Sequence, residues 1–381
     1  MAQFVTDENK LEKCIPEEGE TAITVPSGIT VIGRDALCGL QNVISVTLPD
    51  SLKVICDGAF YGCSSLNCIT LPESTEKLGS CAFAQCSSLK TIQLDDDLTE
   101  IGNSAFWGCT NLESIVITRG ISKVGYNLFG GCISLTSVTL PNSITELDER
   151  AFKECSALTS ITLPGGLLSI GNMAFLNCHS LRSVTVPDSV TSIGEKAFFM
   201  CESLSELEIP DSVTYVGGDA FSDSESVVVR STVSGKPLYK AVTATDGSPA
   251  YNFILRNIWS TKGFDFAAQD NYFPALQDEK LQFEIAFSRL MYKVELSTDI
   301  EKQYLDFLHN NAEKVVRYCI DKDSDELLRF ADSSGLITKD NISALTVYAD
   351  EHGNTAVTAY LLSVAGRLND GNRDIFSDLE L

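Results

Sequence analysis

Residues 197–217 read AFFMCESLSELEIPDSVTYVG, and variants of this string recur along the first part of the chain, up to residue 230. A cysteine returns at an unbroken interval of 23 residues at seven positions: Cys63, Cys86, Cys109, Cys132, Cys155, Cys178 and Cys201. A phenylalanine lies three residues before each of these cysteines, and a leucine lies three residues after it. A fixed interval of this kind means that each side chain occupies the same place in a repeated structural unit.

Each unit predicts two short strands and one tight turn. The segment Leu-x-x-Ile-x-Leu-Pro places aliphatic side chains at alternating positions, as a strand with one buried face does, and its proline ends the strand. A second short strand, Val-x-x-Ile, follows, and we expect the glycine after it to supply the conformational freedom that a turn needs. Ala-Phe-x-x-Cys then forms a tight turn whose Phe and Cys both point inward.

One unit of 23 residues cannot bury its apolar side chains alone, so we predict that successive units stack. Stacking places the phenylalanines in one column and the cysteines in another. Cysteine suits that place as a small hydrophobe whose weak S–H donor can reach nearby carbonyls. A disulfide framework or a zinc site explains the thirteen cysteines less well, because the chain has three histidines and no Cys-x-x-Cys pair.

The full pattern, Leu-x-x-Ile-x-Ile/Leu-Pro-x-x-Val-x-x-Ile-Gly-x-x-Ala-Phe-x-x-Cys, resembles the BspA-type leucine-rich repeat. It covers residues 21–230, roughly nine units. Five positions depart from it: Cys56 and Asp148 replace the glycine, Asp95 and Thr118 replace the proline, and Leu40 replaces the first cysteine. The resemblance implies a right-handed solenoid with a parallel sheet and a role in protein interaction. It also implies a bacterial protein, often one that is secreted or held at the cell surface.

The repeat ends after Arg230, and the remainder of the chain predicts helices. Apolar side chains follow helical spacing in residues 283–291 and 304–308. Residues 325–335 and 353–366 form two further helical stretches, with a helix over 339–351 between them. This arrangement resembles degenerate ankyrin-type helix pairs without the Thr-Pro-Leu-His signature. We expect the helical part to cap the last solenoid unit.

The predicted fold is a repeat solenoid, a leucine-rich repeat with a parallel β-sheet and short turns, followed by an all-α ankyrin-like helical domain. We divide the chain into an acidic N-terminal segment (1–20), the solenoid (21–230), a junction rich in turn residues (231–250), the helical domain (251–366) and an acidic C-terminal tail (367–381).

The charge of the chain bears on its partners. Lys and Arg number 28 against 52 Asp and Glu, which gives a net charge of −24. Binding to nucleic acid or to an anionic membrane needs clustered basic residues, so we expect neither. No apolar run approaches the roughly 20 residues of a membrane span, and residues 1–20 do not read as a secretory signal. We therefore expect a cytoplasmic protein, with the cell surface as the alternative.

Two short motifs invite a chemical interpretation. Residues 321–325 (DKDSD) resemble the start of a calcium loop, but Glu326 stands where the loop needs glycine, and Asp332 stands where it needs a bidentate glutamate. An acidic first turn of a helix explains this segment more simply. Cys178 precedes His179 as a nucleophile and base would, although neighbours on a turn point in different directions, which favours a surface histidine. We predict no enzyme activity, no cofactor and no metal.

The outward side chains of the solenoid are the candidate binding residues, because solenoids bind through continuous open faces. On the Leu-x-x-Ile-x-Leu-Pro strand of each unit they form rows rich in Ser and Thr. From these rows we select Thr70, Thr91, Gln93, Thr139, Thr162, Thr185, Glu206 and Glu208. The alternative is that these are solvated strand residues that bond to their neighbours in adjacent units. A second row, on the turn, carries three outlying aromatic side chains: Tyr61, Trp107 and Phe199. Such aromatics mark a partner site or a contact with the helical part.

Three functions follow from these features. The first is a non-catalytic module that binds a partner protein through the open face, with the helical part as a cap or a second binding site. The second is a bacterial surface or secreted adhesin that binds a ligand. An enzyme with its site in the helices ranks last. Because the chain is strongly acidic, we expect the partner to carry a basic surface.

Overall fold

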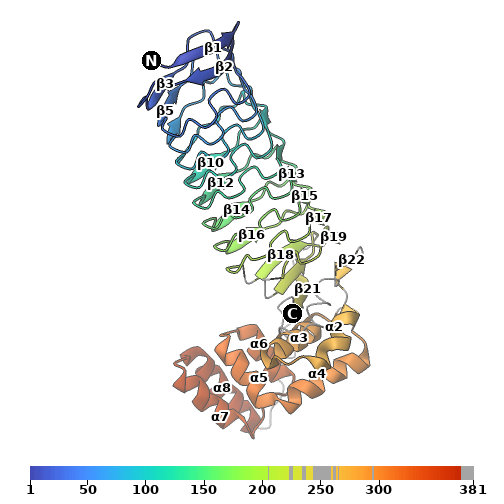
Figure 1. Ribbon diagram of the computed structural model, residues 1–381. Helices are drawn as coiled ribbons and strands as arrows, with labels where there is room; N and C mark the ends of the chain where they lie inside the picture. Colours follow the sequence, from blue (N-terminus) through green and yellow to red (C-terminus); the bar gives the residue numbers. More distant parts are fainter. Residues whose placement is uncertain are drawn as a thin grey trace. The chain divides into compact units, whose positions relative to one another are not determined.

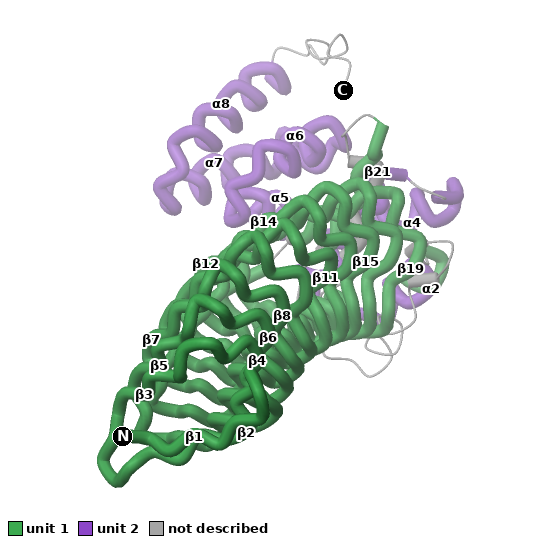
Figure 2. The backbone as a smooth tube through the Cα atoms, turned by 90° about the horizontal axis from the view of Figure 1, so that it is seen from above, with its two compact units in different colours: residues 1–269 green, residues 270–381 purple. Residues whose placement is uncertain are grey.

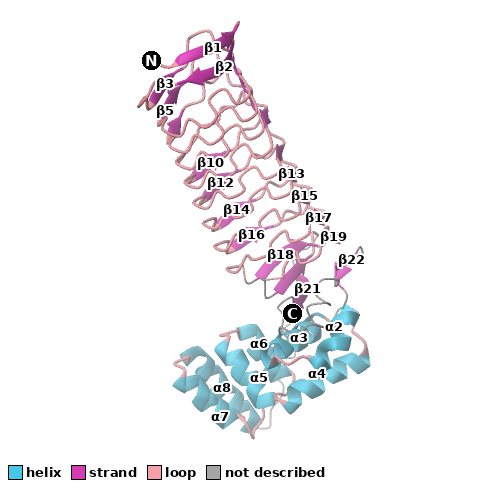
Figure 3. Ribbon diagram, in the orientation of Figure 1, coloured by secondary structure: helices cyan, strands magenta, loops and turns pink. Residues whose placement is uncertain are grey.

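The computed structural model describes residues 1–204, 206–222, 226–233, 237–242, 259–260, 263–264, 266–293 and 296–369 (Figure 1). The chain divides into two compact units, residues 1–269 and residues 270–381, which Figure 2 distinguishes by colour. The first unit is a solenoid of short parallel strands, and the second is made of helices (Figure 3). The predicted fold class is confirmed: a parallel β-solenoid of about nine turns spans residues 10–230 and is followed by helices. The predicted C-terminal tail lies outside the described residues from position 370 onward.

Most coils of the solenoid have two strands, and equivalent strands of neighbouring coils pair in parallel in several short sheets (Figures 1 and 3). The strands of the first side are β3 (Ala22–Thr24), β5 (Ser45–Thr47), β7 (Cys68–Ile69), β10 (Ser114–Val116), β12 (Ser137–Thr139), β14 (Ser160–Thr162), β16 (Ser183–Thr185), β18 (Glu206–Pro210) and β20 (Ser226–Arg230). Those of the second side are β2 (Lys10–Ile15), β4 (Val31–Ile32), β6 (Val54–Ile55), β8 (Lys77–Leu78), β9 (Glu100–Ile101), β11 (Lys123–Val124), β13 (Glu146–Leu147), β15 (Ser169–Ile170), β17 (Ser192–Ile193) and β19 (Tyr215–Val216).

The pairing register reproduces the sequence interval. Val31 pairs with Val54, Lys77 with Glu100, and Ser160 with Ser183, each across 23 residues. The interval is shorter at the two ends of the solenoid, where Lys10 pairs with Val31 across 21 residues and Glu206 pairs with Ser226 across 20. The second of these falls where the repeat pattern decays in the sequence, as expected of an end repeat.

The predicted columns of phenylalanine and cysteine form the core, and both predictions are confirmed. Adjacent phenylalanine rings from Phe60 to Phe221 stack with centroids 5.0–6.2 Å apart. Each of the seven cysteines from Cys63 to Cys201 is buried and donates its S–H to a backbone carbonyl of the preceding coil. The two columns bind successive coils to one another, so the solenoid is one continuous core.

The glycines that follow the second strand have a different role from the one predicted. Their backbone does not adopt the left-handed conformation that favours glycine. Instead, a Cβ atom on Gly102 would lie 2.3 Å from the backbone nitrogen of Ser80, and one on Gly217 would lie 2.2 Å from that of Glu195. These contacts are shorter than any van der Waals contact. At these two positions glycine lets the backbones of adjacent coils approach closely.

Antiparallel strands cover both ends of the solenoid, and the sequence interpretation placed no strand at either position. At the start, β1 (Gln3–Asp7) pairs with β2, which in turn pairs in parallel with β4, so residues 1–20 contribute to the solenoid sheet. At the far end, β21 (Pro237–Val242) pairs with β20 inside the segment that we predicted as a turn-rich junction. An uncovered strand edge exposes unpaired backbone groups, and these two strands occupy the edges of the first and last coils.

The helices begin later than the sequence pattern suggested. Residues 259–264 contain a short antiparallel pair, β22 (Trp259–Ser260) with β23 (Gly263–Phe264), within the range that we predicted as helical from residue 251. The helical elements are α2 (Phe266–Tyr272), η1 (Phe273–Ala275), α3 (Glu279–Tyr292), α4 (Thr298–Asn310), α5 (Ala312–Asp321), α6 (Asp325–Ser333), α7 (Ile342–Glu351) and α8 (Thr355–Asn369). The helices predicted over 283–291, 304–308, 325–335 and 339–351 are confirmed, and α8 continues three residues beyond Gly366.

A buried charged cluster helps to hold the helical unit together. The guanidinium group of Arg289 in α3 donates two hydrogen bonds of 2.7 Å to the carboxylate of Asp270 in α2. The Tyr304 hydroxyl of α4 donates a third, also of 2.7 Å. Arg289 is 1% exposed, so this cluster fixes three helices from within the core.

Candidate binding surfaces

The candidate residues on the first side of the solenoid share one surface, which we call the strand face. It consists of the outward side chains of Thr70, Thr91, Gln93, Thr139, Thr162, Thr185 and Glu208, all of which are exposed. The register aligns them in rows, because Thr162 pairs with Thr185 and Thr185 with Glu208. Thr91 and Gln93 join the rows through isolated bridges rather than through a full strand. Glu206 lies in β18, but its side chain is not among those that the structure describes.

The hydroxyl groups of the strand face are not used by the fold. Within the part of the chain that the structure describes, the side chains of the strand face form no hydrogen bond or ion pair with another residue. Elsewhere on the solenoid the opposite holds: Thr99 donates to the carbonyl of Glu76 and Thr136 to that of Glu113, in each case in the preceding coil. The alternative interpretation, that strand-face residues bond to their neighbours, therefore does not describe these side chains. They are free to donate to and accept from a ligand.

The three aromatic residues of the turn row do not form one patch. Tyr61 is 38% exposed and Trp107 is 37% exposed, while Phe199 is half-buried. Tyr61 and Trp107 lie two coils apart, and the coil between them carries the fully buried Ala84 at the equivalent position. Phe199 lies four coils further along. The turn row thus offers separated aromatic side chains rather than the continuous surface that partner binding favours.

The Cys178–His179 pair has no arrangement for catalysis. Cys178 is fully buried and donates to the carbonyl of Phe152 at 3.2 Å, and burial raises the pKa of its thiol well above the usual value. The side chain of His179 is on the surface, with Nδ1 3.7 Å from a carboxylate oxygen of Glu202. A thiol that stays protonated is a poor nucleophile.

The polar side chains of the acidic segment before α6 form hydrogen bonds within the helical unit. The hydroxyl of Ser324 caps α6 by accepting from the backbone N–H of Leu327. The side-chain amide of Asn354 donates to Asp323 at 2.7 Å, and the Tyr348 hydroxyl donates to Asp321 at 2.8 Å. In the described residues, no group of three or more His, Cys, Asp and Glu side chains is placed to hold a metal ion.

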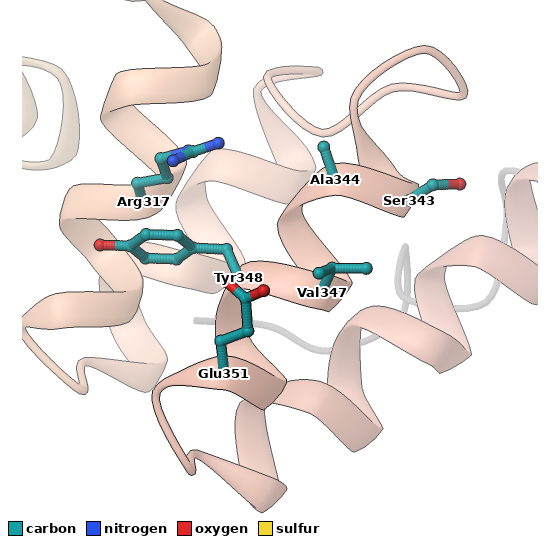
Figure 4. A pocket seen from close by; sticks show the side chains of 6 residues that line it. All are labelled: Arg317, Ser343, Ala344, Val347, Tyr348 and Glu351. Atoms are coloured by element: carbon teal, nitrogen blue, oxygen red, sulfur yellow. The ribbon is translucent and has the colours of Figure 1, made fainter.

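A shallow hollow in the helical unit was not found from the sequence. It measures about 390 Å³ and is lined by Arg317 of α5 and by Ser343, Ala344, Val347, Tyr348 and Glu351 of α7 (Figure 4). The Arg317 guanidinium lies over the Tyr348 ring, 4.6 Å from its centroid, and also pairs with Glu313. Val347 is 57% exposed. A hollow this open, with its one cation already paired, can receive part of a partner surface but does not enclose a small molecule.

The repeat pattern can be assigned to a family. Residues 17–134 and 99–228 match the BspA type leucine rich repeat region, in six copies. The chain belongs to this family. The match covers more than half of the chain and ends before the helices begin. None of the curated proteins matches the chain.

Three solved leucine-rich repeat structures are similar to this family member. A leucine rich cell surface protein from Faecalibacterium prausnitzii A2-165 is 29% identical over 59% of this chain and 74% of its own, with a TM-score of 0.49. A leucine-rich repeat protein from Bacteroides ovatus ATCC 8483 is 32% identical over 51% of this chain and 65% of its own, with a TM-score of 0.40. The T. pallidum leucine rich repeat protein is 26% identical over 54% of this chain and 87% of its own, with a TM-score of 0.39.

Among the described helices, none combines the length and the apolar character that a membrane span requires.

Proposed function

We propose that this BspA-type protein is a non-catalytic interaction module that binds a partner protein through the strand face. The observation that carries the proposal is the set of exposed Thr and Gln side chains that make no hydrogen bond within the described fold. A rigid sheet that holds free donors and acceptors in register loses little entropy when a partner binds. The partner is expected to carry a basic surface, because the chain has a net charge of −24.

The helical unit serves as a cap or as a second binding site in this proposal. Tyrosine–carboxylate hydrogen bonds recur in it at similar sequence separations: Tyr348 to Asp321 across 27 residues and Tyr360 to Asp332 across 28. A recurring separation of this size supports stacked, ankyrin-like helix pairs. We retain 231–250 as the junction and 251–366 as the helical domain in the proposal.

Capture experiments with the full-length protein test the binding face. The strand-face variant carries Thr139→Lys, Thr162→Lys and Thr185→Lys. The control carries the same change at exposed threonines beside the second side of the solenoid, whose hydroxyls donate to carbonyls of the preceding coil: Thr145, Thr191 and Thr214. We expect partners captured by the wild type to be lost with the strand-face variant and kept with the control. The proposal fails if both variants keep them, or if only Val347→Lys, at the hollow of α7, loses them.

The cytoplasmic location remains a prediction, with the cell surface as its alternative. All thirteen cysteines are free in the structure. Thiol titration of freshly purified, unfolded protein separates the two locations, because a reducing compartment leaves thiols free and an oxidising one does not.

A further inference from the structure

Carboxylates border the strand face at both ends, but among the described residues the fold bonds those of the last coils and leaves most of those of the first coils without a partner. In the first coils these carboxylates lie three residues beyond Thr47, Thr70 and Gln93: Asp50, Glu73 and Asp96, with Asp97 adjacent. All four are exposed. Towards the other end, Asp188 pairs with Arg230 at 2.6 Å, and Asp211 accepts from the backbone N–H of Thr232 at 3.0 Å. An exposed basic residue precedes the strand in both regions, Lys90 before Thr91 and Arg182 before β16.

The carboxylates of the first coils are not balanced by the fold. Among the described residues, Asp50, Glu73 and Asp97 have no ionic partner, and Asp96 has only Arg119, at 3.5 Å and largely solvated. Equivalent positions in adjacent coils are separated by about 4.8 Å, the strand spacing, so like charges there repel one another.

Charges on the second side of the solenoid are arranged differently. There three lysines each meet a carboxylate of a neighbouring coil. The pairs are Lys53–Glu76 at 2.7 Å, Lys77–Glu100 at 2.7 Å and Lys123–Asp148 at 3.0 Å. The same stacking geometry thus pairs these charges on the second side, whereas Asp50, Glu73 and Asp97 have no partner among the described residues beside the first coils of the strand face.

We propose that the first coils of the strand face, from β5 to the bridge at Gln93, bind a basic polypeptide segment of the partner. Its Lys and Arg side chains pair with Asp50, Glu73 and Asp97, while Thr70, Thr91 and Gln93 bond to its polar groups. Charge complementarity selects this occupant, because a cationic segment supplies the counter-charges that the fold omits. This inference rests on the proposed function and assigns to it the chemistry of the partner.

A synthetic peptide of alternating Lys and Ser, labelled with a fluorophore, is the probe, and fluorescence anisotropy measures its binding to the full chain. The test variant is Asp50→Asn, Glu73→Gln, Asp97→Asn. The control, Asp299→Asn, Asp306→Asn, Glu326→Gln, removes the same charge from exposed positions of the helical unit. We expect the test variant to weaken binding about tenfold and the control less than about twofold, with the difference reduced by salt.

Equal weakening in both variants would overturn the inference, because general attraction to the acidic chain would then explain binding. Binding of an alternating Glu and Ser peptide with similar affinity, or no binding of the basic peptide by the wild type, would overturn it as well. In each of these cases the proposed function survives if the strand-face variant Thr139→Lys, Thr162→Lys, Thr185→Lys still loses its captured partner. Thermal unfolding without any peptide gives a second readout. The test variant should have a higher thermal midpoint than the wild type, because it removes like-charge repulsion.

Discussion

The thiol of Cys109 donates a hydrogen bond to the backbone carbonyl of Phe83 in the preceding coil, with Sγ 3.1 Å from the oxygen. The same bond joins six further pairs of coils, and the donor is always the residue that returns every 23 positions. Each cysteine therefore fills a place in the core and also satisfies a buried carbonyl. A smaller apolar residue can perform neither task completely.

Replacing Cys109 by Ala should destabilise the protein by about 2 kcal/mol, because the change leaves a small cavity and an unpaired buried carbonyl. Urea unfolding measures this difference. The control is Cys68→Ala on the exposed surface of β7, which should change stability by less than about 0.5 kcal/mol. Similar losses in the two variants would show that the buried position of the thiol is unimportant.

Stability should fall as the pH rises from 9 to 12. Burial raises the pKa of Cys63 and Cys132 to about 12, against a usual value of 9.0. In this range the unfolded chain loses a thiol proton that the folded chain keeps, so the unfolded state is favoured, and below pH 9 the effect is absent. Each such thiol contributes a slope of about 1.4 kcal/mol per pH unit. Urea unfolding of Cys132→Ala should show a shallower decline than the wild type, and an identical decline would contradict the assignment.

Thr75 is a polar exception in the core, and replacing it should stabilise the protein. It is 2% exposed, its hydroxyl has no hydrogen-bond partner among the described residues, and the equivalent position in the next coil is the buried Leu98. Thr75→Val keeps the shape and removes the unpaired group, so we expect a gain of about 1 kcal/mol in the free energy of unfolding. Thr70→Val, on the exposed strand face, is the control and should change little. A loss of stability in Thr75→Val would mean that the hydroxyl has a partner in solution.

Because adjacent coils approach closely at some glycines and not at others, replacing two glycines by alanine should change the stability by very different amounts. Gly102→Ala forces a Cβ to within 2.3 Å of a backbone nitrogen and should cost about 3 kcal/mol or more. Gly165→Ala meets no atom within 4 Å and should be neutral or slightly stabilising. Thermal unfolding of both variants measures this difference, and equal thermal midpoints would show that the space beside the glycine does not decide these positions.

The sequence predicted the parts of the fold that depend on the period and missed those that depend on local backbone geometry. The interval alone places Phe106 above Phe83 and Cys109 above Cys86, because stacking turns a sequence repeat into a spatial column. It does not show that Arg150 and Met173 adopt left-handed backbone conformations, since the residue type changes from coil to coil while the conformation is kept. The end strand β21 was missed for a related reason: it lies outside the repeat.

The candidate surface was predictable only in part. Alternation of side chains in a strand placed Thr139 and Thr162 on the outer face, and they are exposed. Whether their hydroxyls bond to neighbouring coils depends on distances that no sequence pattern contains. The unpaired carboxylates beside the first coils were also missed, because they stand out only when Asp50 and Glu73 are compared with the paired charges on the second side.

Removing the arginine of the buried ion pair in the helical unit should cost far more stability than removing the arginine of an exposed pair. Arg289→Met leaves the carboxylate of Asp270 buried without its cation and should cost about 3–5 kcal/mol, measured through the helical circular dichroism signal. Arg329→Met removes a pair with Asp325 whose side chains are 60% and 81% exposed, and should cost less than about 0.5 kcal/mol. If an unpaired charge causes the loss, adding Asp270→Asn to Arg289→Met should restore part of it. A double variant as unstable as the sum of both single variants would instead attribute the loss to packing.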